Sequence, residues 1–175
     1  MRGHTMITVA EFDRLEEEEF RYELDEGELL TLTRPGVVHG RIERRLIVAL
    51  QTYLDAHPVG EVFGSDVLFV LGAATKRAPD VSVLLRPAGD GKEILGAPEI
   101  AIEILSASNR PISMRRKIGQ FFAAGCKLAW IVDPDRRTIE IWKSASAPDR
   151  TLTESDTLDA QELLPGFSIA VRGIF

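Results

Sequence analysis

Two short, mostly apolar segments constrain the fold of this chain more than any other feature: residues 81–85 (VSVLL) and 99–105 (EIAIEIL). Segments of this length and composition are typical of strands that are buried on both faces of a sheet. Because side chains alternate along a strand, Glu99, Ala101 and Glu103 share one face, and the isoleucines between them share the other. The sequence therefore predicts two central strands, with Glu103 pointing away from the isoleucines near the end of its strand.

Residues 38–54 are predicted to form an amphipathic helix. The apolar residues that recur at helical spacing form one stripe: Ile42, Leu46, Ala49, Leu50 and Tyr53. His39 lies on this stripe, whereas Arg41 and Arg44 point away from it. This helix can therefore cover one face of the sheet.

A second helix is predicted from Pro111 to the helix-terminating Gly125. Its buried stripe consists of Met114, Ile118, Phe121 and Phe122. Lys117 lies at the margin of this stripe and can reach inward, while Arg116 and Gln120 lean further toward solvent.

The remaining elements are shorter. Thr8 and Glu11 have the spacing of a capping box, which predicts a helix that runs to about Glu18. A hairpin is predicted from two strands that flank Asp25-Glu26-Gly27, over residues 20–24 and 28–32. Further strands are expected at 62–63, 67–71, 128–133 and 138–142, with a last short strand or lid at 164–169. Strands and helices in this order indicate an α/β fold.

Length and composition fit one soluble domain over residues 1–175, because 45% of the residues are hydrophobic and 27% are charged. We expect residues 1–7 to be disordered or to derive from an expression vector. No apolar segment approaches the roughly 18 residues that span a bilayer, and no signal peptide is visible, so a cytoplasmic protein with no membrane partner is expected. Cys126 is the only cysteine, which excludes an internal disulfide and a cysteine-based zinc cluster.

The net charge of −6 argues against a protein that coats nucleic acid non-specifically, because such binding depends on neutralising phosphates. Any nucleic-acid site must therefore be local. Three basic clusters could provide it: Arg41/Arg44/Arg45, Arg110/Arg115/Arg116/Lys117 and Arg136/Arg137.

Asp80 and Glu103 are the candidate ligands of a divalent metal. They are carboxylates at the ends of two neighbouring predicted strands, and Mg²⁺ prefers oxygen ligands. With such a metal, a nearby lysine such as Lys117 can orient an attacking water or neutralise developing charge in phosphodiester hydrolysis. Taken alone the pattern is weak, because the alternative for each residue is a surface or salt-bridged position.

Four further residues are secondary candidates. Glu28 in the hairpin could be a third metal ligand. His39 could contact phosphate or act as an acid or base, although a histidine on an apolar stripe is more often a hydrogen-bonded core residue. Arg115 and Arg116 could contact nucleic-acid phosphates, and the alternative is a solvated helix face.

A series of short blocks carries a resemblance to a known family. The blocks are Tyr22 to Glu28 (YELDEGE), His39, Pro79-Asp80-Val81, Pro98 to Ser106 (PEIAIEILS), Lys117, Gly125, Trp130 to Pro134 (WIVDP) and Leu164 to Phe167 (LPGF). In order and spacing, the sequence resembles the Uma-two family, a large group of inferred restriction endonucleases in the PD-(D/E)xK nuclease superfamily. The resemblance covers the chain from Thr8 to Phe175.

The resemblance implies a restriction-endonuclease-like core, a mixed sheet flanked by helices, preceded here by the N-terminal helix and hairpin. It also implies Asp80 as the motif aspartate, Glu103 as the second acid, and Mg²⁺ or Mn²⁺ as cofactor. The superfamily's usual lysine position is occupied by Leu105. The chain is similar to branches in which the lysine has moved to the following helix, where it would be Lys117.

The leading hypothesis is a magnesium-dependent nuclease that acts on DNA, as a homodimer. The rival hypothesis is a non-catalytic domain with the same fold that binds a nucleic acid or a protein partner, because fold does not determine function. A third hypothesis, an enzyme that acts on a small phosphorylated molecule, fits the charge but has no motif to support it.

Overall fold

A six-stranded sheet forms the centre of the molecule. The computed structural model describes residues 6–14, 21–32, 34–106 and 111–175. The strand order is β11-β10-β9-β8-β6-β3, and every neighbouring pair is antiparallel except β8 and β9, which are parallel. The bounds are β3 Glu61–Gly64, β6 Val81–Leu84, β8 Ile100–Ile104, β9 Leu128–Asp133, β10 Thr138–Trp142 and β11 Arg150–Leu152. The two predicted central strands, β6 and β8, are indeed neighbours, and every residue of both is buried.

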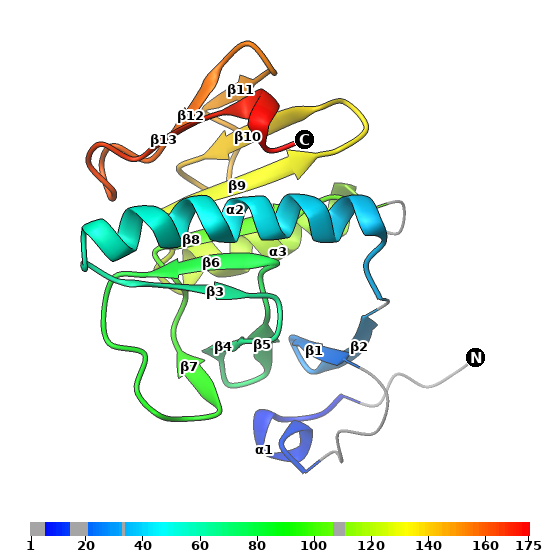
Figure 1. Ribbon diagram of the computed structural model, residues 1–175. Helices are drawn as coiled ribbons and strands as arrows, with labels where there is room; N and C mark the ends of the chain where they lie inside the picture. Colours follow the sequence, from blue (N-terminus) through cyan, green and yellow to red (C-terminus); the bar gives the residue numbers. More distant parts are fainter. Residues whose placement is uncertain (1–5, 15–20, 33, 107–110) are drawn as a thin grey trace.

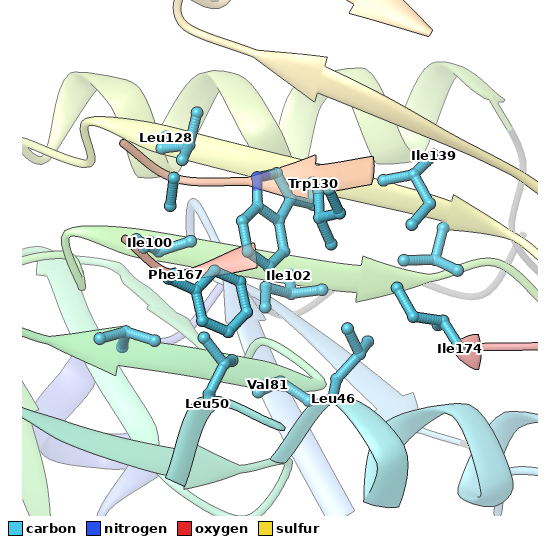
Figure 2. Packing of buried hydrophobic residues seen from close by; sticks show 14 of the residues in the cluster. Leu46, Leu50, Val81, Ile100, Ile102, Leu128, Trp130, Ile139, Phe167 and Ile174 are labelled. Atoms are coloured by element: carbon cyan, nitrogen blue, oxygen red, sulfur yellow. The ribbon is translucent and has the colours of Figure 1, made fainter. Parts of the chain in front are cut away.

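Helix α2 (Val37–Ala56) covers one face of this sheet (Figure 1). The buried residues of the helix are Ile42, Leu46, Leu50 and Leu54. They pack in one cluster with the isoleucines of β8, and burying each such side chain contributes roughly 1.5–3 kcal/mol. Trp130 and Phe167 stack in the same cluster with ring centroids 6.2 Å apart (Figure 2). The C-terminal elements therefore complete this core: β12 Thr157–Asp159, β13 Ser168–Ala170 and the 3₁₀ helix η1 Val171–Gly173.

Helix α3 (Pro111–Ala123) packs on the opposite face and is the crossover between the parallel strands β8 and β9. Met114, Ile118 and Phe121 are buried there in a cluster with Ala101 and Ala129 from these strands. Gly125 follows the helix with φ of +108°, a conformation that glycine adopts without strain. The helix and its terminator are as predicted.

A second sheet carries the N-terminal hairpin in the order β2-β1-β5-β4-β7. The bounds are β1 Arg21–Asp25, β2 Glu28–Leu32, β4 Leu68–Gly72, β5 Thr75–Arg77 and β7 Glu93–Leu95. The two residues of the hairpin turn, Glu26 and Gly27, have φ of +50° and +92°, as a two-residue turn between right-twisted strands requires. The predicted hairpin is confirmed.

Several sequence expectations differ from the structure. Helix α1 covers only Val9–Phe12, although its capping box of Thr8 and Glu11 is present. It has no buried residue and ends at Phe12, with Asp13 as its C-cap, and residues 15–20 lie outside the described ranges. Of the stretch expected to be disordered or vector-derived, residues 1–5 also lie outside them, and Ile7 donates its backbone N–H to the Gly27 carbonyl at 2.8 Å. In the described part of the chain, no helix is both long and apolar enough to cross a membrane.

Candidate active site

Asp80 lies at the end of the central sheet, one residue before β6. The antiparallel register pairs Val81 with Ile102, so that Asp80 comes next to the end of β8 where Glu103 lies. Asp80 Oδ2 accepts a hydrogen bond from the backbone N–H of Ile104 at 2.7 Å. This bond fixes the carboxylate against the strand that carries the second acid.

Glu103 is buried on the face of β8 opposite the isoleucines, with 3% of the residue exposed. Burial raises the pKa of its carboxyl group to about 8, and the charges of Asp80 and Glu23 add to this effect, against the attraction of Lys117. A carboxylate in this position is costly unless a cation neutralises it.

Lys117 reaches this site from α3. Its ammonium nitrogen lies 2.7 Å from Glu103 Oε1 and 2.8 Å from Glu23 Oε1, and it donates a hydrogen bond to the Ala78 carbonyl at 3.0 Å. Burial lowers the pKa of Lys117, but the carboxylates of Glu103, Glu23 and Asp80 outweigh this effect, and the net shift is upward. Lys117 is therefore an ammonium ion at neutral pH.

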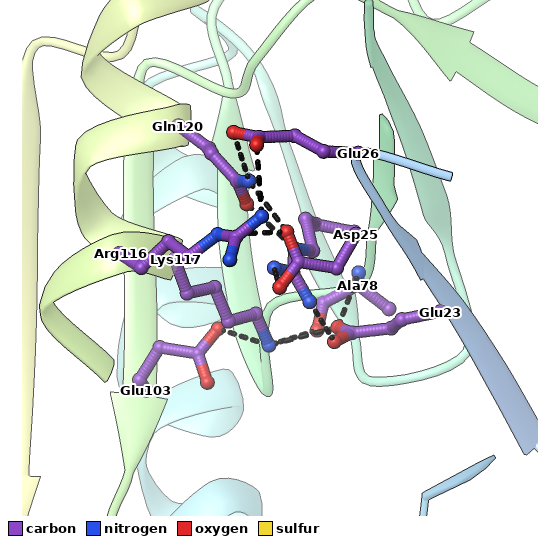
Figure 3. Close-up of polar contacts among 9 residues, drawn as sticks. Glu23, Asp25, Glu26, Ala78, Glu103, Arg116, Lys117 and Gln120 are labelled. Atoms are coloured by element: carbon purple, nitrogen blue, oxygen red, sulfur yellow. Dashed lines mark hydrogen bonds and ion pairs between the residues drawn. The ribbon is translucent and has the colours of Figure 1, made fainter. Parts of the chain in front are cut away.

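A polar network joins the hairpin to α3 beside this lysine (Figure 3). Glu23 Oε2 accepts from Arg77 Nη1 at 3.1 Å, and Arg77 Nη2 lies 2.7 Å from Asp25 Oδ2. Gln120 accepts from Arg77 Nε at 2.8 Å and donates to Asp25 Oδ1 at 2.7 Å. Arg116 forms ion pairs with Asp25 and with Glu26, at 3.1 and 2.8 Å.

The secondary candidates occupy different places. His39 lies beside Asp80, with Nε2 3.2 Å from Oδ1, and is mostly buried. Glu28 is paired with Asp25 in the hairpin register, and its role as a metal ligand stays a prediction. Arg115 is exposed on α3. Arg116 is exposed, as expected, and it also pairs with the hairpin through Asp25 and Glu26.

The sequence analysis missed Glu23, Arg77 and Gln120. Glu23 belongs to a hairpin with four acidic residues in six positions, 23–28, and nothing in this run distinguishes the two that are buried, Glu23 and Asp25. Arg77 is 2% exposed, although arginine is almost never fully buried unless it is paired. Gln120 follows Lys117 at i+3, which places both on one side of the helix, and this spacing was the available signal.

Asp80 and Glu103 fit a hard divalent cation. Their oxygens are the ligand type that Mg²⁺ and Mn²⁺ prefer. A cation held by these carboxylates would offset the burial and the repulsion from Asp80, both of which raise the pKa of Glu103. Over residues 6–14, 21–32, 34–106 and 111–175, no three His, Cys, Asp or Glu side chains form a metal cage. Magnesium does not need such a cage, because it is commonly held by one or two carboxylates and several waters.

The comparison with protein families shows which family the chain belongs to. The model of the family Uma2, described as "Putative restriction endonuclease", matches residues 9–172. The chain belongs to the Uma2 family. The matched region includes Asp80, Glu103 and Lys117, and the resemblance seen in the sequence is confirmed.

The fold of this Uma2 protein is similar to that of a solved structure, a crystal structure described as "a putative nuclease belonging to DUF820" from Anabaena variabilis ATCC 29413. The TM-score is 0.83, the identity is 21%, and the match covers 97% of each chain. This likeness confirms the predicted restriction-endonuclease-like α/β architecture. No curated protein matched the chain. Membership of Uma2 supports a nuclease function at the level of the family.

Proposed function

We propose that this protein is a divalent-metal-dependent endonuclease that hydrolyses phosphodiester bonds of DNA. The observation that carries the proposal is the grouping of Asp80, Glu103 and Lys117 at the end of the central sheet, with the lysine nitrogen 2.7 Å from Glu103. Such a group of two acids and one ammonium ion matches the needs of phosphodiester hydrolysis. Membership of Uma2 supports the same reaction.

In this proposal Asp80 and Glu103 hold Mg²⁺ or Mn²⁺. When bound, the metal would polarise the phosphoryl oxygen and lower the pKa of a water molecule. Lys117 stays protonated because its pKa is raised. It therefore orients the attacking water and stabilises negative charge on the phosphate, and it does not serve as the base.

Exposed arginines on the two helices that carry His39 and Lys117 support an anionic substrate. Arg115 is exposed on α3, two residues before Lys117, and Arg41 is exposed in the first turns of α2, two residues after His39. Exposed arginines of this kind could contact phosphates even though the net charge of the chain is −6. The same acidity favours the rival proposal, a non-catalytic domain that binds a partner.

The test is DNA cleavage by the manganese-loaded protein, with supercoiled, linear and single-stranded DNA as substrates. Asp80→Ala is expected to abolish cleavage and to keep the fold. The control is Glu99→Gln, which should cut normally; Glu99 is a carboxylate one residue before β8, the strand of Glu103. Full cleavage by Asp80→Ala would overturn the assignment. Metal binding separates the two proposals, because a binding domain has no need of a metal at Asp80 and Glu103.

We further propose that the protein acts as a homodimer in the cytoplasm. Each chain supplies one such site, and two sites are required to cut both strands of a duplex in one encounter. Sedimentation equilibrium with and without duplex DNA tests this proposal. A monomer in both conditions would contradict it.

A further inference from the structure

Lys117 must be positioned by other groups, because it extends from a helix toward a site on the sheet. Its side chain has four rotatable bonds, and fixing it in one conformation costs rotamer freedom. The ammonium group has three N–H donors, and three oxygens surround it, from Glu103, Glu23 and the Ala78 carbonyl. The lysine therefore has one defined place for its nitrogen, set by β8, β1 and the segment before Asp80.

Glu23 is the member of this group that the proposed reaction leaves without a role. It comes from the second sheet, is 2% exposed, and lies 2.8 Å from the lysine nitrogen. Its Oε1 also accepts from the Ala78 backbone N–H at 2.9 Å. Lys117 thus binds the carbonyl of Ala78 and Glu23 binds its N–H, and Ala78 lies two positions before Asp80.

Glu23 is itself held in place. Burial raises the pKa of its carboxyl group, but Lys117 and Arg77 outweigh that effect, so the net shift is downward and the group is ionised. Arg77 is in turn fixed by Asp25 and by Gln120. Gln120 belongs to α3, so a closed ring of contacts runs from Lys117 through Glu23 and Arg77 back to the lysine's own helix.

We propose that Glu23 is a positioning residue that holds the Lys117 ammonium at Glu103 and Asp80. The proposal concerns the placement of Lys117, and only its effect on cleavage rests on the proposed nuclease function. Glu23 touches neither substrate nor reacting atoms in this account. Its contribution is to keep the Lys117 side chain from rotating away from the site when Glu103 binds the metal.

The test is NMR of the lysine ammonium groups, with assignment by Lys117→Met. In the wild type, the Lys117 ammonium protons are expected to exchange slowly with water, because they are buried and hydrogen-bonded. The signal should disappear in Glu23→Gln, and also in Glu23→Asp, whose shorter side chain cannot reach the nitrogen. Asp25→Asn is the matched control. Asp25 lies in the same strand as Glu23 and also pairs with Arg77, but it does not contact Lys117. This variant should therefore keep the signal.

Three results would overturn the proposal: a rapidly exchanging Lys117 ammonium in the wild type, an unchanged signal in the two folded Glu23 variants, or equal loss in Asp25→Asn. The wild-type measurement decides even if a variant fails to fold. Cleavage gives a second readout, in which Glu23→Gln should lower kcat about 10-fold or more and leave KM nearly unchanged. If the wild type cuts no DNA, the nuclease proposal fails while the ammonium signal still tests Glu23.

Discussion

Lys117 Nζ lies 2.7 Å from Glu103 Oε1, although the lysine comes from helix α3 and the glutamate from strand β8. The position two residues after Glu103, where this superfamily usually has its lysine, is Leu105. The ammonium group beside Glu103 therefore comes from helix α3 and not from the strand that carries Glu103.

Replacing Lys117 by methionine should abolish cleavage and keep metal binding. The substitution removes the ammonium group but leaves the oxygens of Asp80 and Glu103. It should also destabilise the metal-free protein by about 3–5 kcal/mol, because it leaves buried carboxylates without their cation. Calorimetry with manganese and urea unfolding measure the two effects. Retained cleavage, or loss of metal binding in a folded variant, would contradict the assigned role.

The stability of the metal-free protein should fall as pH rises from about 4.5 to 8. The pKa of Glu103 is raised from 4.5 to about 8, mainly by burial. In this window the folded chain binds the proton and the unfolded chain does not. The stabilising contribution is therefore complete below about 4.5 and is lost toward 8, at no more than about 1.4 kcal/mol per pH unit.

Glu103→Gln should remove this dependence, because an amide does not titrate in the window. Urea unfolding with EDTA at pH 5.5, 6.5 and 7.5 compares the two proteins. We expect the wild type to lose stability relative to the variant as pH rises. Parallel pH profiles would show that Glu103 is not the titrating group.

Arg115→Ala should weaken DNA binding, since Arg115 is exposed on α3, the helix that carries Lys117. The expected increase in Kd is about 3- to 10-fold, with the slope of log Kd against log salt reduced by about 1. Arg116→Ala is the matched control, because Arg116 is engaged with Asp25 and Glu26. Binding curves at several salt concentrations, in calcium to prevent cleavage, measure both. Equal losses of DNA affinity in the two variants would contradict the assignment of the phosphate contact to Arg115.

The sequence predicts well those parts of the fold that follow from apolar periodicity. Strands β6 and β8 and the helices α2 and α3 appear where the apolar patterns indicate them. Asp80 directly precedes β6, and β8 and α3 carry Glu103 and Lys117, so the proximity of these three residues could be anticipated. The inward reach of Lys117 was permitted by its place at the margin of the helix stripe.

The second sheet was harder to predict because charged residues form parts of its interior. Strand β5 is Thr75-Lys76-Arg77, and both basic residues are buried. Lys76 forms ion pairs with Asp13 and Glu93, which are far from it in sequence. Burial of such residues depends on partners that come together only in the folded chain, and local patterns do not contain this information.

The most direct test of the account is calorimetric titration of the purified protein with manganese, wild type beside Asp80→Ala and Glu99→Gln. The account predicts saturable binding by the wild type and by Glu99→Gln, and a loss of affinity of about 10-fold or more in a folded Asp80→Ala variant. Absence of binding in the wild type, or equal binding by Asp80→Ala, would contradict the metal site and favour a domain that binds its partner without catalysis.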